Sequence, residues 1–288
     1  MQTYSPEEII KFQNIANIYD VYFIDLWGVI HNGVKLFGNA IEVLNNLKVK
    51  NKKVILISNA PRTNKSVKKF LMKLNFDLRL IDFLVTSGDV TKKYIQDNQN
   101  KKFFHLGPPK DNDLFDGVKN LVDQSKHTDE IVCTGLIDEI GQNISDYQRL
   151  FENWIDKKKV FVCANPDEVV SRGDKIEFCA GALAKYYKKL GGEVKYFGKP
   201  HDAIYDFAYN QIQDQFDRVI DKNRILAVGD NLKTDICGAQ NFGIHSILIL
   251  NGIYKDFFRD NNLNFDKLLI SNEVESLKIG KFQKELKW

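Results

Sequence analysis

Cysteine is scarce in this sequence: its 288 residues contain four, at positions 133, 163, 179 and 237. Their spacing matches no paired metal-binding motif and suggests no disulfide framework, which excludes a small domain held together by disulfides or structural zinc. Each cysteine follows or borders an apolar stretch, so we expect small buried thiols. The chain is long enough for one large domain or two ordinary ones, with a substantial core.

The sequence also lacks an excess of charge of either sign and any long apolar run. Lys and Arg total 41 against 38 Asp and Glu, which leaves a net charge of +3 and no basic stripe for nucleic acid. No apolar run approaches the ~18 residues of a membrane span. Residues 1–10 have no basic start followed by an apolar stretch, and Ser5, Pro6 and Glu8 predict a capped helix there. We therefore expect a cytoplasmic protein that binds neither nucleic acid nor membrane.

Short apolar runs alternate with helical patterns along the chain. The runs are nearly continuous in apolar character, which is typical of strands covered on both faces of a parallel sheet. Eight strands are expected, at 21–24, 54–57, 103–106, 131–134, 160–163, 194–197, 225–228 and 246–250. Helices are expected at 38–50, 64–74, 145–156 and 180–190, with one more after about 255. This alternation predicts an α/β fold with a mainly parallel sheet.

Reactive side chains follow several of these strands. Open parallel sheets bind ligands beyond the carboxyl ends of their strands, so the residues at those ends are the candidates for a site. Any one of them could be a helix cap or part of a turn. The order of acid, hydroxyl, lysine and paired acids is much harder to obtain by chance. These candidates are Asp25, Ser58, Asn59, Lys199, Asp230 and Asp235.

The chemistry of this set indicates a metal and a phosphate. Asp25 and Asp230 would repel each other side by side, and a hard divalent cation such as Mg²⁺ is the usual remedy. Lys199 offers a compact positive charge for a phosphoryl oxygen. Ser58 and the two backbone N–H groups after it suit the remaining phosphate oxygens, especially at the start of a helix.

Four stretches in this order resemble the motifs of the haloacid dehalogenase (HAD) superfamily, which consists mostly of phosphatases. DLWGVIHNG (25–33) is similar to its nucleophile motif and LISNAPR (56–62) to its Ser/Thr motif. FGKPH (197–201) is similar to the lysine motif and VGDNLKTDI (228–236) to the acidic metal motif. The insert between the second and third motifs, with CANPDEVV and CAGAL within 163–183, resembles the type IIA branch. That branch contains NagD, pyridoxal phosphatase and 4-nitrophenyl phosphatases.

The resemblance implies a Rossmann-like core split between residues 1–97 and 195–288 and a smaller inserted α/β cap at 98–194. In such enzymes the cap covers the site, excludes water and selects the substrate. It implies that Asn165 and Asp167 lie in a substrate-binding loop of the cap, which Gly181 helps to shape. Capped relatives often pair through the cap, so a homodimer is one assembly that the resemblance implies.

The resemblance also implies roles for the strand-end residues. Asp25 attacks phosphorus and forms an aspartyl-phosphate. Mg²⁺ is held by Asp25, by Asp230 and by the backbone carbonyl of Trp27. Asp235 orients bound water or Lys199.

The phosphate oxygens are assigned to a second group of residues in the same way. Ser58, the amides of Asn59 and Ala60, and Lys199 stabilise these oxygens in the transition state. The partner implied is a small phosphorylated metabolite.

Trp27 departs from the family pattern, which has Asp two residues after the nucleophile as the acid and base. Indole only donates hydrogen bonds and does not titrate usefully, so Trp27 cannot shuttle protons. We favour a phosphatase that is slow or whose leaving groups need no proton, such as acyl or enol phosphates, with His31 as a partial substitute. A protein that binds phosphate and metal without turnover is the alternative. A 2-haloacid dehalogenase fits least, because metal-free chemistry leaves no reason for a complete GDNLKTD motif.

Overall fold

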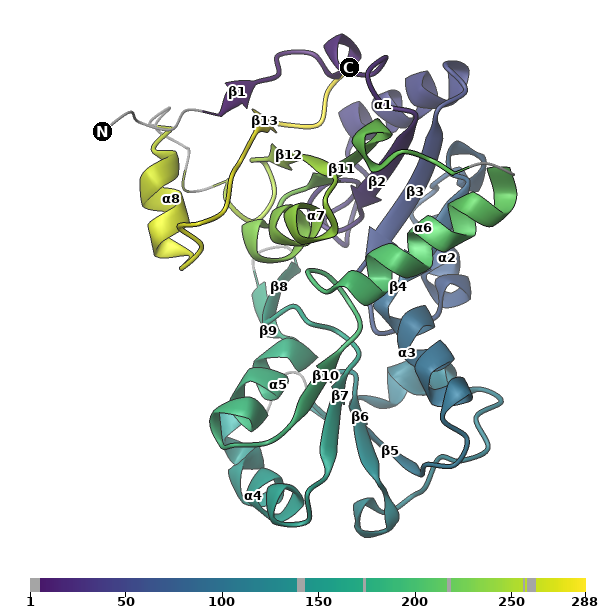
Figure 1. The fold of residues 1–288 in the computed structure, drawn as a ribbon, viewed down its shortest axis with the longest axis vertical. Helices are drawn as coiled ribbons and strands as arrows, with labels where there is room; N and C mark the ends of the chain where they lie inside the picture. Colours follow the sequence, from purple (N-terminus) through teal and green to yellow (C-terminus); the bar gives the residue numbers. More distant parts are fainter. Residues whose placement is uncertain (1–5, 139–142, 173–174, 217–218, 256, 258–262) are drawn as a thin grey trace. The chain divides into compact units, whose positions relative to one another are not determined.

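The computed structural model describes residues 6–138, 143–172, 175–216, 219–255, 257 and 263–288, which form two compact units (Figure 1). The first unit comprises 1–58, 71–85 and 205–288, and the second comprises 59–70 and 86–204. Among the described residues, no helix is long and apolar enough to cross a membrane. The proposed division into a core (1–97 and 195–288) and a cap (98–194) stays a prediction.

A seven-stranded sheet forms the centre of the first unit. Its order is β1-β13-β12-β11-β2-β3-β4, and β2 pairs in parallel with both β3 and β11. Every residue of β2 and β11 is buried, which explains their continuous apolar sequences. The strands are β1 (Glu7–Glu8), β2 (Val21–Asp25), β3 (Lys53–Ser58), β4 (Phe83–Thr86), β11 (Ile225–Gly229), β12 (His245–Ile249) and β13 (Lys281–Gln283).

The helices assigned wholly or partly to the first unit connect these strands. Helix α8 (Phe265–Ser271) packs against β12 and β13 together with the segment that follows β11. The contact is a buried apolar cluster that includes Leu232, Leu248 and Leu268. The helices are α1 (Gly38–Val49), α2 (Asn64–Lys73), α6 (Asp202–Phe216), α7 (Cys237–Phe242) and α8 (Phe265–Ser271).

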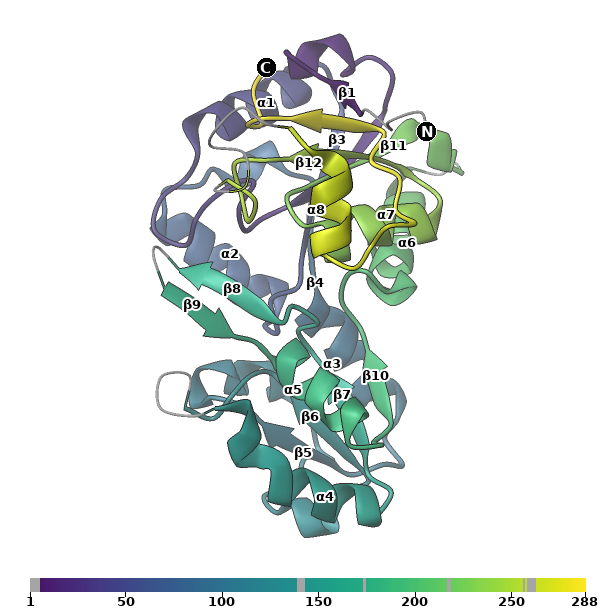
Figure 2. The same cartoon turned by 90° about the vertical axis from the view of Figure 1, so that its left-hand side faces the viewer.

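The second unit has its own parallel sheet, in the order β10-β7-β6-β5, and an antiparallel pair, β8 and β9. Helices α4 and α5 cover one face of the parallel sheet, where Trp154 and Tyr187 are buried (Figures 1 and 2). Helix α3 covers the other face through Ile95. The elements are α3 (Ser87–Asp97), β5 (Phe103–Leu106), β6 (Glu130–Cys133), α4 (Gln148–Asp156), β7 (Val160–Cys163), β8 (Val169–Arg172), β9 (Lys175–Phe178), α5 (Ala180–Lys189) and β10 (Val194–Tyr196).

The predicted α/β fold with a mainly parallel sheet is confirmed, and all eight expected strands are present. The predicted helix at the N-terminus is wrong within the described residues, because Glu7 and Glu8 form β1 and pair with β13. Its cap, Ser5, lies outside the described residues. Pairing with a strand more than 270 residues away therefore overrides the local capping signal.

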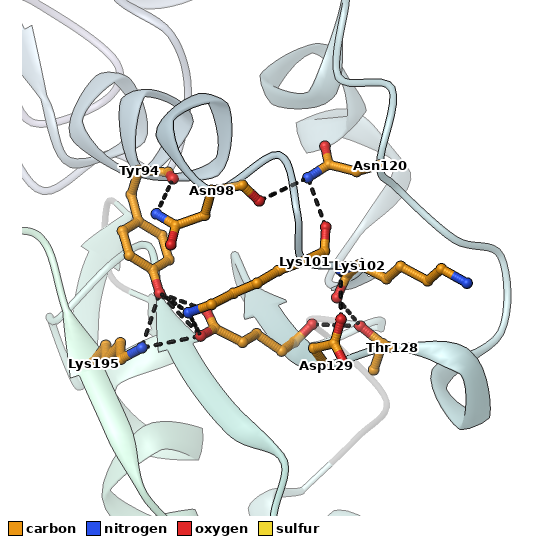
Figure 3. Close-up of polar contacts among 9 residues, drawn as sticks. Tyr94, Asn98, Lys101, Lys102, Asn120, Thr128, Asp129 and Lys195 are labelled. Carbon is orange, nitrogen blue, oxygen red and sulfur yellow. Dashed lines mark hydrogen bonds and ion pairs between the residues drawn. The ribbon is translucent and has the colours of Figure 1, made fainter.

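A buried carboxylate stabilises the second unit (Figure 3). Glu130 begins β6 with only 3% of its side chain exposed, and it accepts hydrogen bonds from Lys101 at 2.7 Å and Lys195 at 3.0 Å. The Tyr94 hydroxyl donates to Glu130 at 2.8 Å and accepts from both lysines. Burial, the largest effect, raises the pKa of Glu130, but these hydrogen bonds together hold that pKa below its ordinary value of 4.5. The network ties α3 to β6, to β10 and to Lys101, which lies just before β5.

We expect Glu130→Gln to lower the free energy of unfolding at pH 7 by about 2–4 kcal/mol, because two lysines lose their buried partner. This loss is smaller than the loss expected for a fully buried ion pair, because both lysine side chains are about a third exposed. The pKa of Glu130 is lower in the folded state, so its contribution is present above about pH 4.5 and is lost as the pH falls below that value. Urea unfolding at pH 7 and pH 4 should therefore show a smaller difference between variant and parent at pH 4.

The matched control is Asp97→Asn, which breaks the exposed pair between Lys93 and Asp97. We expect a change within about 0.5 kcal/mol at both pH values. An equal effect of the two substitutions at pH 7 would contradict the role given to Glu130.

Candidate functional site

Three carboxylates meet at one edge of the sheet in the first unit. Asp25, Asp230 and Asp235 each offer a carboxylate oxygen, and these oxygens lie within 4.8 Å of one another. The three residues are only 8%, 7% and 4% exposed. The structure thus brings together the acids that the sequence placed at the ends of two strands.

The register of the sheet explains this convergence. Asp25 is the last residue of β2 and pairs with Ile57, so Ser58 is the next residue along the neighbouring strand. On the other side Ile24 pairs with Val228, and Gly229 ends β11 just before Asp230. Because all three strands are parallel, their carboxyl ends place Asp25 between Ser58 and Asp230.

Backbone groups hold the two acids that follow β11. Asp230 accepts a hydrogen bond from the Ile253 N–H at 2.9 Å, and Asp235 accepts one from the Asn231 N–H at 3.1 Å. Asn231 also caps the π-helical segment Leu232–Ile236, which carries Asp235 back toward the strand end. Both carboxylates are therefore oriented before any ligand arrives.

Two glycines make room for the Asp230 carboxylate. A Cβ atom at Gly28 would lie 2.0 Å from Asp230 Oδ2, and one at Gly252 would lie 1.8 Å from the same oxygen. Gly28 has a φ of +84°, a conformation that glycine adopts without strain. Gly28 of the nucleophile motif thus leaves room for the Asp230 carboxylate, which follows β11.

These donors fit a hard divalent cation. Such ions prefer oxygen ligands, and Mg²⁺ takes one or two carboxylates together with water and phosphate oxygens. Three buried carboxylates whose oxygens lie within 4.8 Å of one another carry negative charge that a cation would offset. Among the described residues, no sulfur or imidazole ligand belongs to this cluster, which disfavours a soft metal.

Trp27 packs against the turn that follows β2. A Cβ atom at Gly33 would lie 2.5 Å from Trp27 Cη2, so the missing side chain of Gly33 leaves room for the indole. The Trp27 ring also meets the His31 ring edge-on, with centroids 5.2 Å apart. The indole is partly exposed. The turn is therefore built around this tryptophan.

The structure argues against His31 as a substitute acid at neutral pH. His31 is 2% exposed, and its Nδ1 accepts a hydrogen bond from the Gly33 N–H at 3.0 Å. Burial lowers the pKa of His31 to about 4. The imidazole is then neutral at pH 7 and serves the turn.

Asn59 and Lys199 meet within the second unit. Asn59 Oδ1 accepts from the Lys199 N–H at 2.7 Å, and Asn59 Nδ2 donates to the Lys199 carbonyl at 3.0 Å. The same Nδ2 donates to Asp167 Oδ1 at 2.9 Å. The Asn59 side chain thus fixes the backbone of the buried Lys199, which is 3% exposed. No local pattern predicts this role of the Asn59 side chain, because its partners lie 108 and 140 residues away.

The loop at 165–167 is fixed from two sides. Asn165 is 8% exposed, and its Oδ1 accepts from the Asp167 N–H at 3.1 Å. Gly181 donates its N–H to the Asp167 carbonyl at 3.1 Å, and a Cβ atom there would lie 2.2 Å from the Pro166 carbonyl oxygen. Gly181 therefore packs directly against this loop, at the position where sequence analysis expected it to shape the loop.

The start of α3 holds the loop that follows Ser58. The Gly88 N–H donates to the Ala60 carbonyl at 3.0 Å, and Thr86 Oγ1 donates to the Arg62 carbonyl at 2.6 Å. Asp89 accepts from the Asn64 N–H at 3.0 Å. Sequence analysis did not predict the hydrogen bonds of Thr86, Gly88 and Asp89. The cluster of Thr, Gly and Asp after the apolar run FLV is nevertheless typical of a helix N-terminus.

Comparisons with known proteins agree with the motifs. The family model described as haloacid dehalogenase-like hydrolase matches residues 22–119, and a HAD-hydrolase-like model matches residues 196–263. The chain is 24% identical to phosphoglycolate phosphatase 1A, chloroplastic, from Arabidopsis thaliana over 273 residues, which is 86% of this chain and 73% of that protein.

Solved structures extend the similarity. A haloacid dehalogenase-like hydrolase from Brucella suis 1330 is 35% identical, with a TM-score of 0.82 over 85% of this chain and 90% of that one. The 4-nitrophenylphosphatase from Thermotoga maritima is 22% identical, with a TM-score of 0.70 over 94% of this chain and 96% of that one. The second likeness concerns the fold.

Proposed function

Because the chain belongs to the haloacid dehalogenase-like hydrolases, we propose that it is a Mg²⁺-dependent phosphatase that acts on a small phosphorylated metabolite. The observation that carries this proposal is the cluster of Asp25, Asp230 and Asp235 beside Ser58 at the carboxyl ends of parallel strands. The similar proteins include phosphatases by name, and this chain is a phosphoric monoester hydrolase of unknown substrate.

Each residue at the site has its own role in the reaction. Asp25 attacks phosphorus with a carboxylate oxygen; the bond to the ester oxygen breaks, and an aspartyl-phosphate forms on Asp25. Water then cleaves the aspartyl-phosphate and releases inorganic phosphate. Ser58, Lys199 and the amides of Asn59 and Ala60 bind the oxygens of the transferred group.

Asp25, Asp230 and the Trp27 carbonyl would hold Mg²⁺, which when bound neutralises charge on the phosphoryl group. Asp235, whose carboxylate accepts a hydrogen bond from the Asn231 N–H, is the third carboxylate of the cluster and would orient bound water. Asn165, Asp167 and Gly181 shape the loop that selects the substrate.

Trp27 decides which substrates turn over quickly. Trp27 cannot give a proton to the leaving oxygen. Fast turnover is therefore limited to substrates whose leaving groups are stable as anions. We therefore infer that the enzyme prefers acyl, enol or aryl phosphates to alkyl phosphates.

The test is hydrolysis of 4-nitrophenyl phosphate, acetyl phosphate and glycerol 3-phosphate, each with Mg²⁺ and with EDTA. We expect turnover that requires Mg²⁺, and kcat/KM for the first two substrates at least about a hundredfold above that for the alkyl phosphate. Equal rates for all three would contradict the inference from Trp27.

A second candidate function rests on the same tryptophan. Without an acid and base at this position, the site could bind phosphate and metal as a sensor without turnover. Tight Mg²⁺-dependent binding of phosphate in calorimetry, with no hydrolysis of any of the three esters, would favour the sensor over the enzyme.

A further inference from the structure

Arg62 is the last residue of the LISNAPR motif, and no role has yet been given to its side chain. The Arg62 side chain is 33% exposed, and its Nε donates to Asp111 Oδ1 at 2.7 Å. Asp111 is 2% exposed and lies in the 3-10 segment Pro109–Phe115 of the same unit. In the described part of the chain, Asp111 is the sole polar partner of the Arg62 side chain. The two terminal nitrogens of the guanidinium therefore keep four N–H groups for other acceptors.

The backbone of Arg62 is fixed. Its carbonyl accepts from Thr86 Oγ1 at 2.6 Å, and a Cβ atom at Gly88 would lie 2.4 Å from the same carbonyl oxygen. With the backbone held by α3 and Nε held by Asp111, both ends of the side chain are constrained. A binding group held in this way loses little entropy when a ligand arrives.

The guanidinium of Arg62 lies beside a buried carboxyl group. Burial, the largest effect, raises the pKa of Asp111, whereas Arg62, Lys110 and a hydrogen bond with the Thr134 side chain lower it. The partly exposed guanidinium keeps its own charge, and its planar fork matches the two oxygens of a carboxylate.

We propose that Arg62 binds a carboxylate of the substrate, which makes the substrate class a phosphorylated carboxylic acid. This inference rests on the proposed function. Ala60, whose amide is assigned to the phosphate, precedes Arg62 by two residues, so their Cα atoms are at most about 7 Å apart. A guanidinium fork pairs with a carboxylate through two parallel N–H···O bonds. A short substrate that carries phosphate at one end and carboxylate at the other can therefore satisfy both groups.

The experiment measures kcat/KM of the parent protein with Mg²⁺ by the release of inorganic phosphate, so that every residue assigned to the metal stays in place. The substrates are 3- and 4-carboxyphenyl phosphate, the two matching carbamoylphenyl phosphates, and phenyl phosphate. We expect kcat/KM for at least one carboxylate to exceed that for its amide by roughly ten- to a hundredfold, as a charge-assisted pair predicts. In Arg62→Gln this ratio should fall to within about threefold of one, and in Arg62→Lys, which keeps the charge without the fork, to an intermediate value.

The control is Arg79→Gln, which removes an arginine held by Asp77 on the surface. The carboxylate-to-amide ratio should not change there. Phenyl phosphate separates the two hypotheses. If the parent protein hydrolyses it and the carboxylate-to-amide ratio is near one, the inference about Arg62 is overturned and the proposed function stands. If the parent protein does not hydrolyse phenyl phosphate with Mg²⁺, the proposed function fails and the inference fails with it.

Discussion

Asp25→Asn is expected to reduce kcat for 4-nitrophenyl phosphate by at least about a thousandfold. An amide is a far weaker nucleophile than a carboxylate, and removal of the attacking group leaves only binding and electrostatic contributions. The replacement has almost the same size, and Asp25 ends a strand that pairs on both sides, so the fold should persist. The measurement is the initial rate at saturating Mg²⁺, with circular dichroism to compare the folded state.

A chemical readout separates the loss of the nucleophile from a general loss of binding. Acid quench during turnover of a ³²P-labelled substrate should trap label on the parent protein and none on Asp25→Asn. Asp97→Asn, an exposed acid in the second unit, should keep both the rate and the label. A variant at position 25 that retains more than about a tenth of the parent rate would rule out Asp25 as the attacking group.

The sequence predicted the central strands because their signal is local. Both faces of β2, β3 and β11 are covered, so each one reads as an apolar run with a clear end. The edge strand β1 and its neighbour β13 are two and three residues long and carry no such run. They exist because of their pairing with each other and with β12, which a local pattern cannot express.

The site also combines residues that a pattern in the sequence predicts with contacts that no such pattern predicts. Asp25, Ser58 and Asp230 could be found because parallel strands bring their carboxyl ends to one edge whatever lies between them in the chain. The bond from Asn59 to Asp167 and the pair of Arg62 with Asp111 span 108 and 49 residues and follow no sheet register. Such contacts depend on how loops pack against each other, which no local sequence pattern predicts. Only the structure shows them.

His31 illustrates a role that side-chain chemistry suggested and that packing in the structure argues against. Because His31 lies four residues after Trp27, the sequence indicated that it could act as the proton donor. In the structure the imidazole is buried and accepts from the Gly33 N–H, and its pKa falls to about 4. The absence of a carboxylate at position 27 is therefore not compensated by this histidine.

Trp27→Asp is expected to raise phosphatase activity at least about tenfold, and by up to about 10⁴-fold for alkyl phosphates. The carboxyl group would protonate the leaving oxygen and then activate water against the aspartyl-phosphate. Metal binding should survive, because the backbone carbonyl at position 27 is present with any residue. The gain should grow with the pKa of the leaving group, so a plot of log kcat/KM against that pKa should be flatter for the variant.

The substitution also removes the indole that packs on Gly33 and meets His31 edge-on. We expect this loss to destabilise the turn by about 1–3 kcal/mol, because a partly buried aromatic side chain is replaced by a short polar one. Trp27→Asn is the matched control, since Asn has the size and polarity of Asp without its titrating proton. It should show the same fall in melting temperature and no gain in rate. If Asp and Asn at position 27 change the rate equally, proton transfer is not what this site lacks, and the slow step lies in substrate binding or product release.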